Sequence, residues 1–244
     1  MSPRGKLIVL EGIDGSGKRT QLNMLARALE AHGIACERLS FPRYDGFFGR
    51  MVAQFLNGRF GPLAAVDPHF SALLYAGDRL ESKPTLEAAL NAGQIVLADR
   101  YIGSNLAHQG ARVSAGKRGA FLHWLRQLEY EIYGLPREDM VIYLRVPPQE
   151  AHRLVGKKAQ RQYTKRKRDL QEANRAHLVQ ASALYDHLAR QPNWVRIECA
   201  AASGQRARKA AASSPLRTPE AIHRDILAAI EQRVPLGLAG SVRD

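Results

Sequence analysis

The sequence predicts an α/β fold in which a parallel sheet is covered by helices on both faces. Two observations carry this prediction. Short apolar segments alternate with longer amphipathic ones along the 244 residues, an order typical of strands joined by crossover helices. The first apolar segment, residues 6–11, also runs directly into a glycine-rich turn. With 45% hydrophobic and 24% charged residues, the composition is that of a globular protein, and we expect one domain over residues 1–244.

Each expected element has its own local signal. Strands are short apolar runs, and helices are segments whose apolar residues recur every three or four positions. Asp67 followed by Pro68 is a typical helix start, and Pro84 is expected to open a separate helix that ends before Gly93. The expected strands are residues 6–11, 34–40, 94–98, 140–144 and 194–197. The expected helices are one that ends at Gly33, one that starts at residue 68, residues 84–91, one that ends before Gly134, one from about residue 149, about 169–190, and 219–232.

The turn after the first strand has the Gly-x-x-x-x-Gly-Lys pattern of a P-loop. Glycines let the backbone curl so that its N–H groups point at a phosphate. The following helix adds the positive end of its dipole, and Lys18 reaches the β- and γ-phosphates. An ordinary glycine turn between a strand and a helix is the alternative. The residues expected to bind ATP are Gly12, Ile13, Asp14, Gly15, Ser16, Gly17, Lys18, Arg19 and Thr20.

One position departs from the P-loop pattern. The residue after the lysine is ordinarily Ser or Thr, whose hydroxyl holds magnesium, but here it is Arg19, and Thr20 faces differently on the helix. Either the metal is held elsewhere or Arg19 compensates with its charge. We expect magnesium to remain required, because a divalent ion offsets phosphate charge during transfer from ATP. The candidate ligands, directly or through water, are Asp14, Asp99 and Glu172.

The positive charge of the chain is concentrated in two segments. The formal net charge is +13, yet residues 153–168 contain eight basic residues and no acid, and residues 201–217 contain four basic residues and no acid. The rest of the chain is therefore nearly neutral. A local basic segment is a candidate phosphate clamp as much as a nucleic-acid surface. The Ala-, Ser- and Arg-rich stretch at about 200–217 is expected to be a flexible surface insertion.

We expect a cytoplasmic protein. The apolar stretch at residues 7–10 is too short for a signal peptide and runs into Glu11, and no window approaches the roughly 18 apolar residues that a membrane helix needs. Cys36 and Cys199 lie far apart in the sequence, with no metal-ligand spacing around either. They are expected to be small core residues in a reducing compartment.

Several short motifs follow one another in a fixed order along the chain. They are Leu10 to Lys18 with Thr20-Gln21, Phe41-Pro42-Arg43-Tyr44, Asp99-Arg100-Tyr101 with Ser104-Asn105 and Gln109-Gly110, Gly134-Leu135-Pro136 with Asp139, and Asp169 with Glu172. This order resembles that of the thymidylate kinase family. The likeness covers about residues 5–198 and includes the final helix, and the ordered set is more specific than any one tripeptide. Some bacterial members carry the same Gly-Lys-Arg-Thr variant as residues 17–20.

This resemblance implies a P-loop nucleotide kinase that moves a phosphoryl group from ATP to thymidine monophosphate (dTMP), a step in dTTP synthesis. It also implies a magnesium ion, a homodimer, and a mobile basic lid over ATP at about residues 153–168. Members of this family carry the charge-stabilising arginine either in the P-loop or in the lid. Residues 13–16 contain no arginine, so the resemblance implies a lid arginine, with Arg161 and Arg166 as candidates.

The resemblance also implies roles for acceptor-site residues. Arginine suits a phosphate because its planar fork matches two oxygens, so Arg43 and Arg100 would bind the acceptor phosphate. The ring of Tyr75 would stack on thymine, with Arg79 donating to a base oxygen and Asn105 reading the base edge. His108 stands where many members have a tyrosine that crowds the sugar 2′ side. Asp14 and Glu172 would contact the sugar 3′-hydroxyl or hydrated magnesium, and Asp99 would bind magnesium through water or orient Arg100.

The expected substrate-binding set is Phe41, Arg43, Tyr44, Tyr75, Arg79, Arg100, Asn105 and His108. The expected catalytic set is Asp14, Lys18, Arg19, Arg161 and Arg166.

Several of these residues have plainer interpretations. Arg43 would otherwise be a solvated loop arginine, Tyr75 a core aromatic residue, and Glu172 a helix-surface acid. Two other functions are compatible with the fold: a kinase for another pyrimidine nucleotide or nucleoside, and a P-loop protein whose basic segments bind nucleic acid. The second is not expected, because the basic segments contain one aromatic residue, Tyr163, where base stacking favours several.

Overall fold

The computed structural model describes residues 4–155, 171, 175–201 and 216–236. Its centre is a five-stranded sheet with the order β2-β3-β1-β4-β5, in which every pairing is parallel. The predicted parallel sheet is therefore confirmed. Its strands are β1 (Leu7–Glu11), β2 (Cys36–Ser40), β3 (Ile95–Asp99), β4 (Met140–Arg145) and β5 (Trp194–Glu198).

Strand β1 lies at the centre of both the sheet and the core. All five of its side chains are buried, which explains its continuous apolar run, because a central parallel strand is covered on both faces. Leu10 pairs with Asp99 of β3 on one side and with Ile142 of β4 on the other. The residues that follow β1 and β3 therefore leave the sheet at the same carboxyl edge, where open α/β sheets bind ligands.

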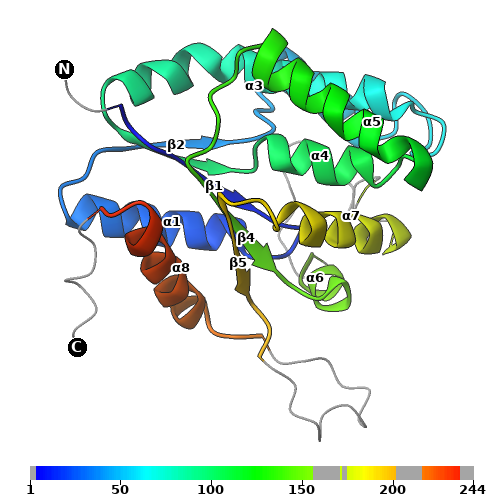
Figure 1. The fold of residues 1–244 in the computed structure, drawn as a ribbon. Coiled ribbons are helices and arrows are strands. Elements are labelled where there is room, and N and C mark those ends of the chain that lie inside the picture. Colours follow the sequence, from blue (N-terminus) through cyan, green and yellow to red (C-terminus); the bar gives the residue numbers. More distant parts are fainter. Residues whose placement is uncertain (1–3, 156–170, 172–174, 202–215, 237–244) are drawn as a thin grey trace, which may run out of the picture.

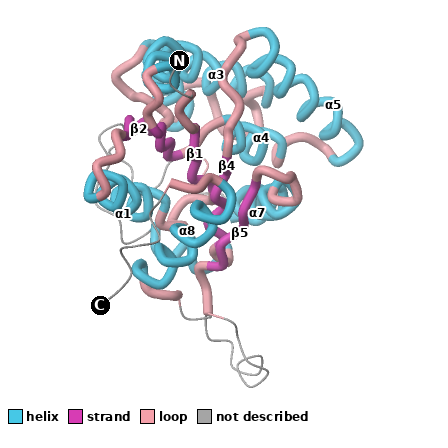
Figure 2. Tube along the Cα trace, turned by 60° about the vertical axis from the view of Figure 1, so that its left-hand side comes forward, coloured by secondary structure: helices cyan, strands magenta, loops and turns pink. Residues whose placement is uncertain are grey.

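Helices cover both faces of the sheet (Figure 1). Helices α1 and α8 lie together on one side, and α3 and α4 lie on the other, an arrangement that the second view also shows (Figure 2). The described helices are α1 (Lys18–Ala31), α2 (Phe47–Leu56), α3 (Pro68–Asn91), α4 (Ile102–Gly110), α5 (Ala115–Arg126), the π-helical turn η1 (Gln127–Ile132), α6 (Pro148–Val155), α7 (Arg175–Leu188) and α8 (Pro219–Arg233).

Helix α3 corrects one prediction. The start at Asp67 and Pro68 is confirmed, since the Asp67 side chain accepts hydrogen bonds from the backbone N–H groups of the first turn. Pro84, however, opens no separate helix but lies inside α3. Proline removes the N–H that would bond to the carbonyl of Leu80, and Pro84 is exposed and Leu80 38% exposed. Water can therefore replace the missing donor, and the helix continues.

A second apolar cluster supports the loop after β2. It consists of Val52, Phe55, Leu56, Val66 and Leu74, with Tyr44 and Tyr75 packed against it. Helices α2 and α3 approach closely at Gly77, where a Cβ atom would lie 2.5 Å from the Phe48 ring. This cluster holds the start of α3 beside the carboxyl edge of the sheet.

Parts of two predicted segments lie outside the described residues: residues 156–168 of the expected lid and residues 202–215 of the expected insertion. The ends of the insertion are described, and Ala200 pairs with Leu216 in an antiparallel bridge. In the described part of the chain, no helix has the length and apolar character needed to cross a bilayer. Cys199 is buried as predicted, whereas Cys36 is only half-buried.

Candidate active site

The glycine-rich turn forms a tight loop at the carboxyl end of β1. Gly12, Gly15 and Gly17 have φ angles of 144°, 89° and 89°, a region that L side chains rarely adopt. A Cβ atom at Gly12 would lie 2.7 Å from the carbonyl oxygen of Leu144, and one at Gly15 would lie 2.5 Å from that of Ala151. Helix α1 starts directly after this loop, so the positive end of its dipole points toward it.

The Lys18 side chain folds back over the loop. Its Nζ donates to the carbonyl oxygens of Gly12 at 2.8 Å and Ile13 at 3.1 Å, and the residue is 6% exposed. The ammonium group is therefore held at the loop, at the start of α1. Arg19 and Thr20, the next two residues, are both exposed.

Two buried oxygen atoms, one in the P-loop and one at the end of β3, have no hydrogen-bond partner in the part of the chain that the structure describes. Ser16 Oγ and Asp99 Oδ1 make no hydrogen bond to the described residues, and Asp99 pairs in register with Leu10, two residues before the loop begins. No cluster of three or more His, Cys, Asp or Glu suited to a metal occurs among the described residues. Magnesium commonly binds through one or two carboxylates together with substrate phosphates and water, so the acids at this edge fit a magnesium ion.

Arg100 joins the P-loop to the neighbouring helix. Its φ is 70°, a strained conformation of the kind that clusters at functional sites. Nη2 donates to Asp14 Oδ1 at 2.7 Å, and Nη1 donates to the Gly12 carbonyl at 3.3 Å and to Ser104 Oγ at 3.1 Å. Burial alone would lower the pKa of Arg100, but the carboxylate of Asp14 raises it well above the ordinary value. The guanidinium is therefore permanently charged.

A cleft opens beside this ion pair. It is lined by most of the residues predicted to bind the acceptor, which come from the loop after β2 and from α3 and α4. The predicted residues in its lining are Asp14, Phe41, Tyr44, Tyr75, Arg79, Arg100, Asn105 and His108, joined by Pro42, Leu56, Ser104, Gln109 and Gln171. The structure thus brings seven of the eight predicted substrate-binding residues to one cavity.

Arg43, the eighth, is not in the lining of the cleft, although its neighbours Pro42 and Tyr44 are. Its backbone N–H donates to both carboxylate oxygens of Asp78, at 3.0 and 3.1 Å, and its Nη1 donates to Ser82 Oγ at 3.2 Å. Asp78 and Ser82 are four residues apart on α3, so they lie on one face of that helix. Burial raises the pKa of Asp78 from 3.8 to about 6. Helix α3 therefore holds the Arg43 loop in place through two side chains.

Arg79, which lines the cleft, forms a buried ion pair with Glu129. Arg79 and Glu129 are 2% and 0% exposed. Arg79 Nε donates to Glu129 Oε2 at 2.5 Å, and Nη2 donates to Oε1 at 2.7 Å. The Asn105 amide nitrogen donates to the same Oε1 at 2.9 Å and to the Ala72 carbonyl at 3.0 Å. Asn105 Oδ1 is buried and has no partner among the described residues.

His108 of α4, which lines the cleft, contacts His177 of α7. His108 Nδ1 lies 3.4 Å from His177 Nε2, and its Nε2 lies 3.5 Å from Arg100 Nη1. Burial and the positive charge of Arg100 lower the pKa of His108 well below its ordinary value. Burial also lowers the pKa of His177, to about 4. Both rings are therefore neutral at pH 7.

Comparison with known proteins bears on this geometry. The family model described as thymidylate kinase matches residues 10–209. The chain belongs to the thymidylate kinase family. Thymidylate kinase from Mycobacterium tuberculosis is 33% identical over 76% of this chain and 86% of its own length. A probable thymidylate kinase from Thermococcus gammatolerans is 30% identical over 96% of this chain and 100% of its own length.

A solved structure supports the fold. Thymidylate kinase from Candida albicans superposes with a TM-score of 0.70, covering 95% of this chain and 93% of that chain, at 19% sequence identity. With the parallel sheet and the glycine loop, this likeness establishes the P-loop kinase fold for this member of the thymidylate kinase family.

Sequence reasoning missed four buried ionisable residues around the thymidylate kinase cleft: Glu11, Asp78, Glu129 and His177. Two of them had a signal in the sequence. Glu11 is an acid at the end of a fully apolar strand, and Glu129 follows Leu125 by four residues, which places it on the buried face of the helix. Asp78 and His177 lie in helices without such a contrast, and only the folded chain shows that they are enclosed.

Three predicted site residues are not located. Arg161, Arg166 and Glu172 lie outside the described residues. Gln171, immediately before Glu172, is described and lines the cleft.

Proposed function

We propose that this chain transfers the γ-phosphoryl group of ATP to dTMP, giving thymidine diphosphate for dTTP synthesis. One observation carries the proposal: the Asp14–Arg100 ion pair, 2.7 Å long, joins a P-loop directly to a cleft lined by aromatic and amide side chains. A candidate phosphate-binding loop and a candidate acceptor cleft thus share one boundary. The thymidylate kinases among the relatives support dTMP as the acceptor.

The donor side would work by holding charge in place. Phosphoryl transfer spreads negative charge over the moving group, so catalysis depends on positioning and electrostatic stabilisation. The loop N–H groups and the start of α1 would hold the phosphates, and Lys18 Nζ would exchange its two carbonyl partners for phosphate oxygens. Arg161 or Arg166 would add charge from the lid.

The acceptor side would hold dTMP across the cleft. Arg100, and Arg43 from the loop that α3 supports, would bind its phosphate, and the ring of Tyr75 would stack on thymine. Arg79 and Asn105 would meet the edge of the base. His108, neutral and beside Arg100, would lie along the sugar.

Magnesium would be held by acids at the carboxyl edge of the sheet. Asp99 has a buried oxygen without a described partner, and Asp14 lies at the loop itself, so these two are the first candidates, with Glu172 as the third. When bound, the ion offsets phosphate charge. Arg19 is exposed at the start of α1 and would add positive charge beside the phosphates.

The test is an acceptor panel. Purified protein with ATP and magnesium is assayed with dTMP, dUMP, dCMP and thymidine by separating the nucleotide products. We expect dTMP to have the highest kcat/KM, and Lys18→Ala to reduce turnover by orders of magnitude while circular dichroism stays unchanged. Preference for thymidine or dCMP would instead support a kinase of the same fold for another acceptor.

The proposal includes a homodimer and a cytoplasmic location. Phe47, Phe70, Leu73 and Leu80 expose between 38% and 60% of their surfaces on α2 and α3, and Leu73 and Leu80 are seven residues apart, on one helix face. Sedimentation should give twice the chain mass of 27.1 kDa, and Leu73→Glu should weaken association. The two free cysteines and the use of ATP support the location.

A further inference from the structure

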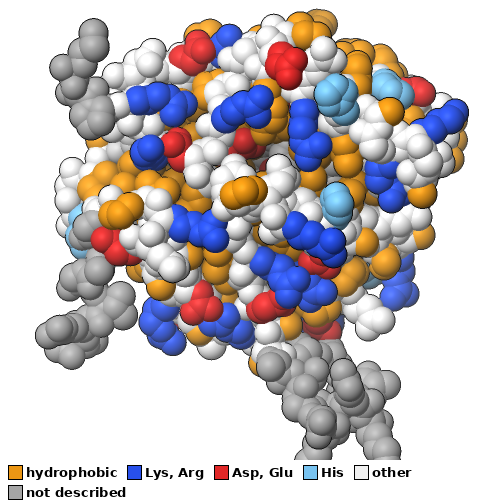
Figure 3. All heavy atoms as spheres, viewed as in Figure 1, with side chains coloured by type: hydrophobic (Ala, Val, Ile, Leu, Met, Phe, Trp, Pro, Cys, Tyr) orange, Lys and Arg blue, Asp and Glu red, His pale blue; other side chains and the backbone are white. Residues whose placement is uncertain are grey.

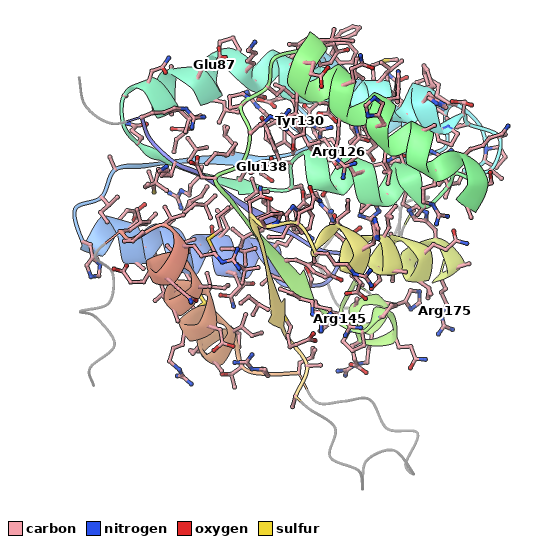
Figure 4. The ribbon with its side chains drawn as sticks, in the orientation of Figure 1. Glu87, Arg126, Tyr130, Glu138, Arg145 and Arg175 are labelled. Atoms are coloured by element: carbon pink, nitrogen blue, oxygen red, sulfur yellow. The ribbon has the colours of Figure 1, made fainter. Side chains whose placement is uncertain are left out.

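One carboxylate, that of Glu129, holds the two cleft residues that are proposed to meet the edge of the base, Arg79 and Asn105. Glu129 lies in the π-helical turn η1, a type of turn that is frequent at functional sites. It receives three hydrogen bonds from two residues of different helices: two from Arg79 of α3 and one from Asn105 of α4. The next residue of the turn is also held in place: Tyr130 points toward Glu138, and its hydroxyl donates to Glu138 Oε2 at 2.7 Å (Figure 4).

The carboxylate determines which way the Asn105 amide faces. Both N–H bonds of the amide are used, one by Glu129 Oε1 and one by the Ala72 carbonyl. A flipped amide would place its oxygen against those two acceptors, and a buried pair of facing acceptors is costly. Oδ1 is therefore fixed as a buried acceptor without a described partner, in a side chain that lines the cleft.

Glu129 also fixes the donor beside this acceptor. It takes the Nε and Nη2 bonds of Arg79, and Nη1 makes no hydrogen bond to the described residues, while Arg79 lines the same cleft. The carboxylate cancels the charge of the guanidinium. This end of the cleft therefore suits an uncharged group that presents a donor next to an acceptor.

We propose that Glu129 is the positioning residue that sets base specificity, by presenting Asn105 Oδ1 as an acceptor and Arg79 Nη1 as a donor. Thymine and uracil offer the complementary pair, an N3–H donor beside the 4-carbonyl acceptor. Cytosine offers the reverse, because its N3 accepts and its 4-amino group donates. This inference rests on the proposed function, since it assumes that the base of the acceptor occupies the cleft.

The experiment compares two variants by their use of dTMP and dCMP. Glu129→Asp keeps the charge but shortens the side chain, so that it cannot hold both partners. We expect KM for dTMP to rise and the dTMP-to-dCMP ratio of kcat/KM to fall, each by at least about tenfold, with KM for ATP nearly unchanged. Leu125→Ala is the matched control, because Leu125 is fully buried on α5 and its truncation costs stability without altering the ratio.

A double-mutant cycle separates positioning from a structural role. In an Asn105→Ala background, Glu129→Asp should lose little further selectivity, because the group that it orients is gone. Additive losses, or a Glu129→Asp variant that is less stable but equally selective, would overturn the inference. Wild-type protein gives a test that needs no variant: 3-methyl-dTMP, which lacks the N3–H, should be used no better than dCMP.

The outcomes of these experiments distinguish the proposed function from the role of Glu129. Failure of the wild-type protein to phosphorylate dTMP would contradict the proposed function itself. Efficient use of both dTMP and 3-methyl-dTMP would leave the proposed function intact and contradict only the role of Glu129.

Discussion

Arg19 occupies the position at which a P-loop ordinarily carries a hydroxyl for magnesium. The structure places it exposed on the first turn of α1, where a positive charge is slightly unfavourable against the helix dipole unless an anion is bound. A residue that does not stabilise its helix points to a role in phosphate binding. Asp14, which contacts Arg100, is the acid within the loop at residues 12–18.

The first prediction compares Arg19→Ser with Asp14→Ala in a magnesium titration. Asp14→Ala should raise the magnesium concentration for half-maximal activity by about 10–100-fold, as the loss of a group that orients a metal does. Arg19→Ser should restore the usual motif without raising activity. If Asp14→Ala left the magnesium dependence unchanged while Arg19→Ser increased activity, Arg19 would be a tolerated defect with no catalytic role.

The second prediction concerns His177, which is 4% exposed. Burial, and to a lesser degree the charge of Arg112, lowers its pKa from 6.5 to about 4. Between pH 6.5 and pH 4 the unfolded chain therefore binds a proton that the folded chain excludes, so this residue makes the fold less stable as the pH falls. From pH 7 to pH 5 the loss should approach 2 kcal/mol, at about 1.4 kcal/mol per pKa unit.

The measurement is the difference in unfolding free energy between wild type and His177→Gln at each pH. That difference should move in favour of the variant as the pH falls. A difference is needed because other groups act with the opposite sign: the pKa values of Asp78 and Glu138 are raised to about 6 and about 7, chiefly by burial, and such carboxyls stabilise the fold as they become protonated. A constant difference from pH 7 to pH 5 would contradict the assignment.

At the scale of elements, the buried carboxylate of Glu11 joins three parts of the fold. Oε1 accepts from the backbone N–H groups of Tyr101 and Ser104, at 2.9 and 2.8 Å, which begin α4. Oε2 accepts from Ser104 Oγ at 2.6 Å and from the Tyr185 hydroxyl of α7 at 2.8 Å. Negative charge at a helix N-terminus is favourable, and these bonds keep α4, which carries Asn105, against the end of β1.

The third prediction is a graded loss on replacing Glu11. In Glu11→Gln the amide oxygen can still face the backbone donors, and its NH₂ can donate to the two hydroxyls, so unfolding should become easier by about 1–3 kcal/mol. Glu11→Ala should cost more, because it leaves the buried donors unpaired. Chemical denaturation measures both, and Tyr185→Phe, which removes one donor alone, is the mild control. Equal stability of Glu11→Ala and wild type would contradict this account.

Most elements could be predicted from the sequence. Apart from the separate helix wrongly expected at Pro84, the two helices that were missed share a physical cause. Strands β1, β3 and β4 are largely apolar runs, and α1 and α8 have clear stops or starts. Helices α2 and α4 were missed because glycines interrupt their patterns. Gly49 is needed where a Cβ atom would overlap the Arg43 carbonyl, and Gly103 where one would approach Glu11 Oε1 at 2.9 Å. Tertiary contact requires those glycines, and a local pattern cannot reveal it.

The residues of the candidate site, too, could be predicted only where a local sequence motif identifies them. Lys18, Arg100 and Asn105 belong to contiguous motifs, which a linear pattern can identify. Glu129 lies 50 residues from Arg79 and 24 from Asn105, so its role depends on how η1, α3 and α4 meet. The charge state of the histidines depends on burial, which the sequence does not give.

At the scale of the molecule, the distribution of charge bears on partners. On the face in Figure 3, Lys and Arg side chains are interspersed with acidic and apolar ones, whereas nucleic-acid binding favours a continuous basic stripe. Two positively charged side chains of the site, Lys18 and Arg100, are largely buried at the carboxyl edge of the sheet. Such a focused positive site suits a small polyphosphate.

The last prediction concerns residues 202–215, which contain three of the basic residues that raise the net charge to +13. The residues on either side of this segment contact each other directly. Ala200 pairs with Leu216, and the Arg217 backbone N–H donates to the Cys199 carbonyl at 2.9 Å. Arg217 Nη1 also donates to the Glu198 carbonyl and contacts Asp225, both at 2.8 Å. The entry into α8 is thus anchored on β5.

Replacing residues 202–215 with two glycines should therefore leave kcat, both KM values and the melting temperature almost unchanged, because the cost of closing a loop varies only slowly with its length. Arg217→Ala, which removes the described anchor instead, should lower the melting temperature and so serves as the matched contrast. Steady-state kinetics and thermal denaturation of the two variants provide the measurement. A large loss of kcat/KM in the shortened chain at an unchanged melting temperature would contradict the prediction, and would assign the segment to the active site or to a partner surface.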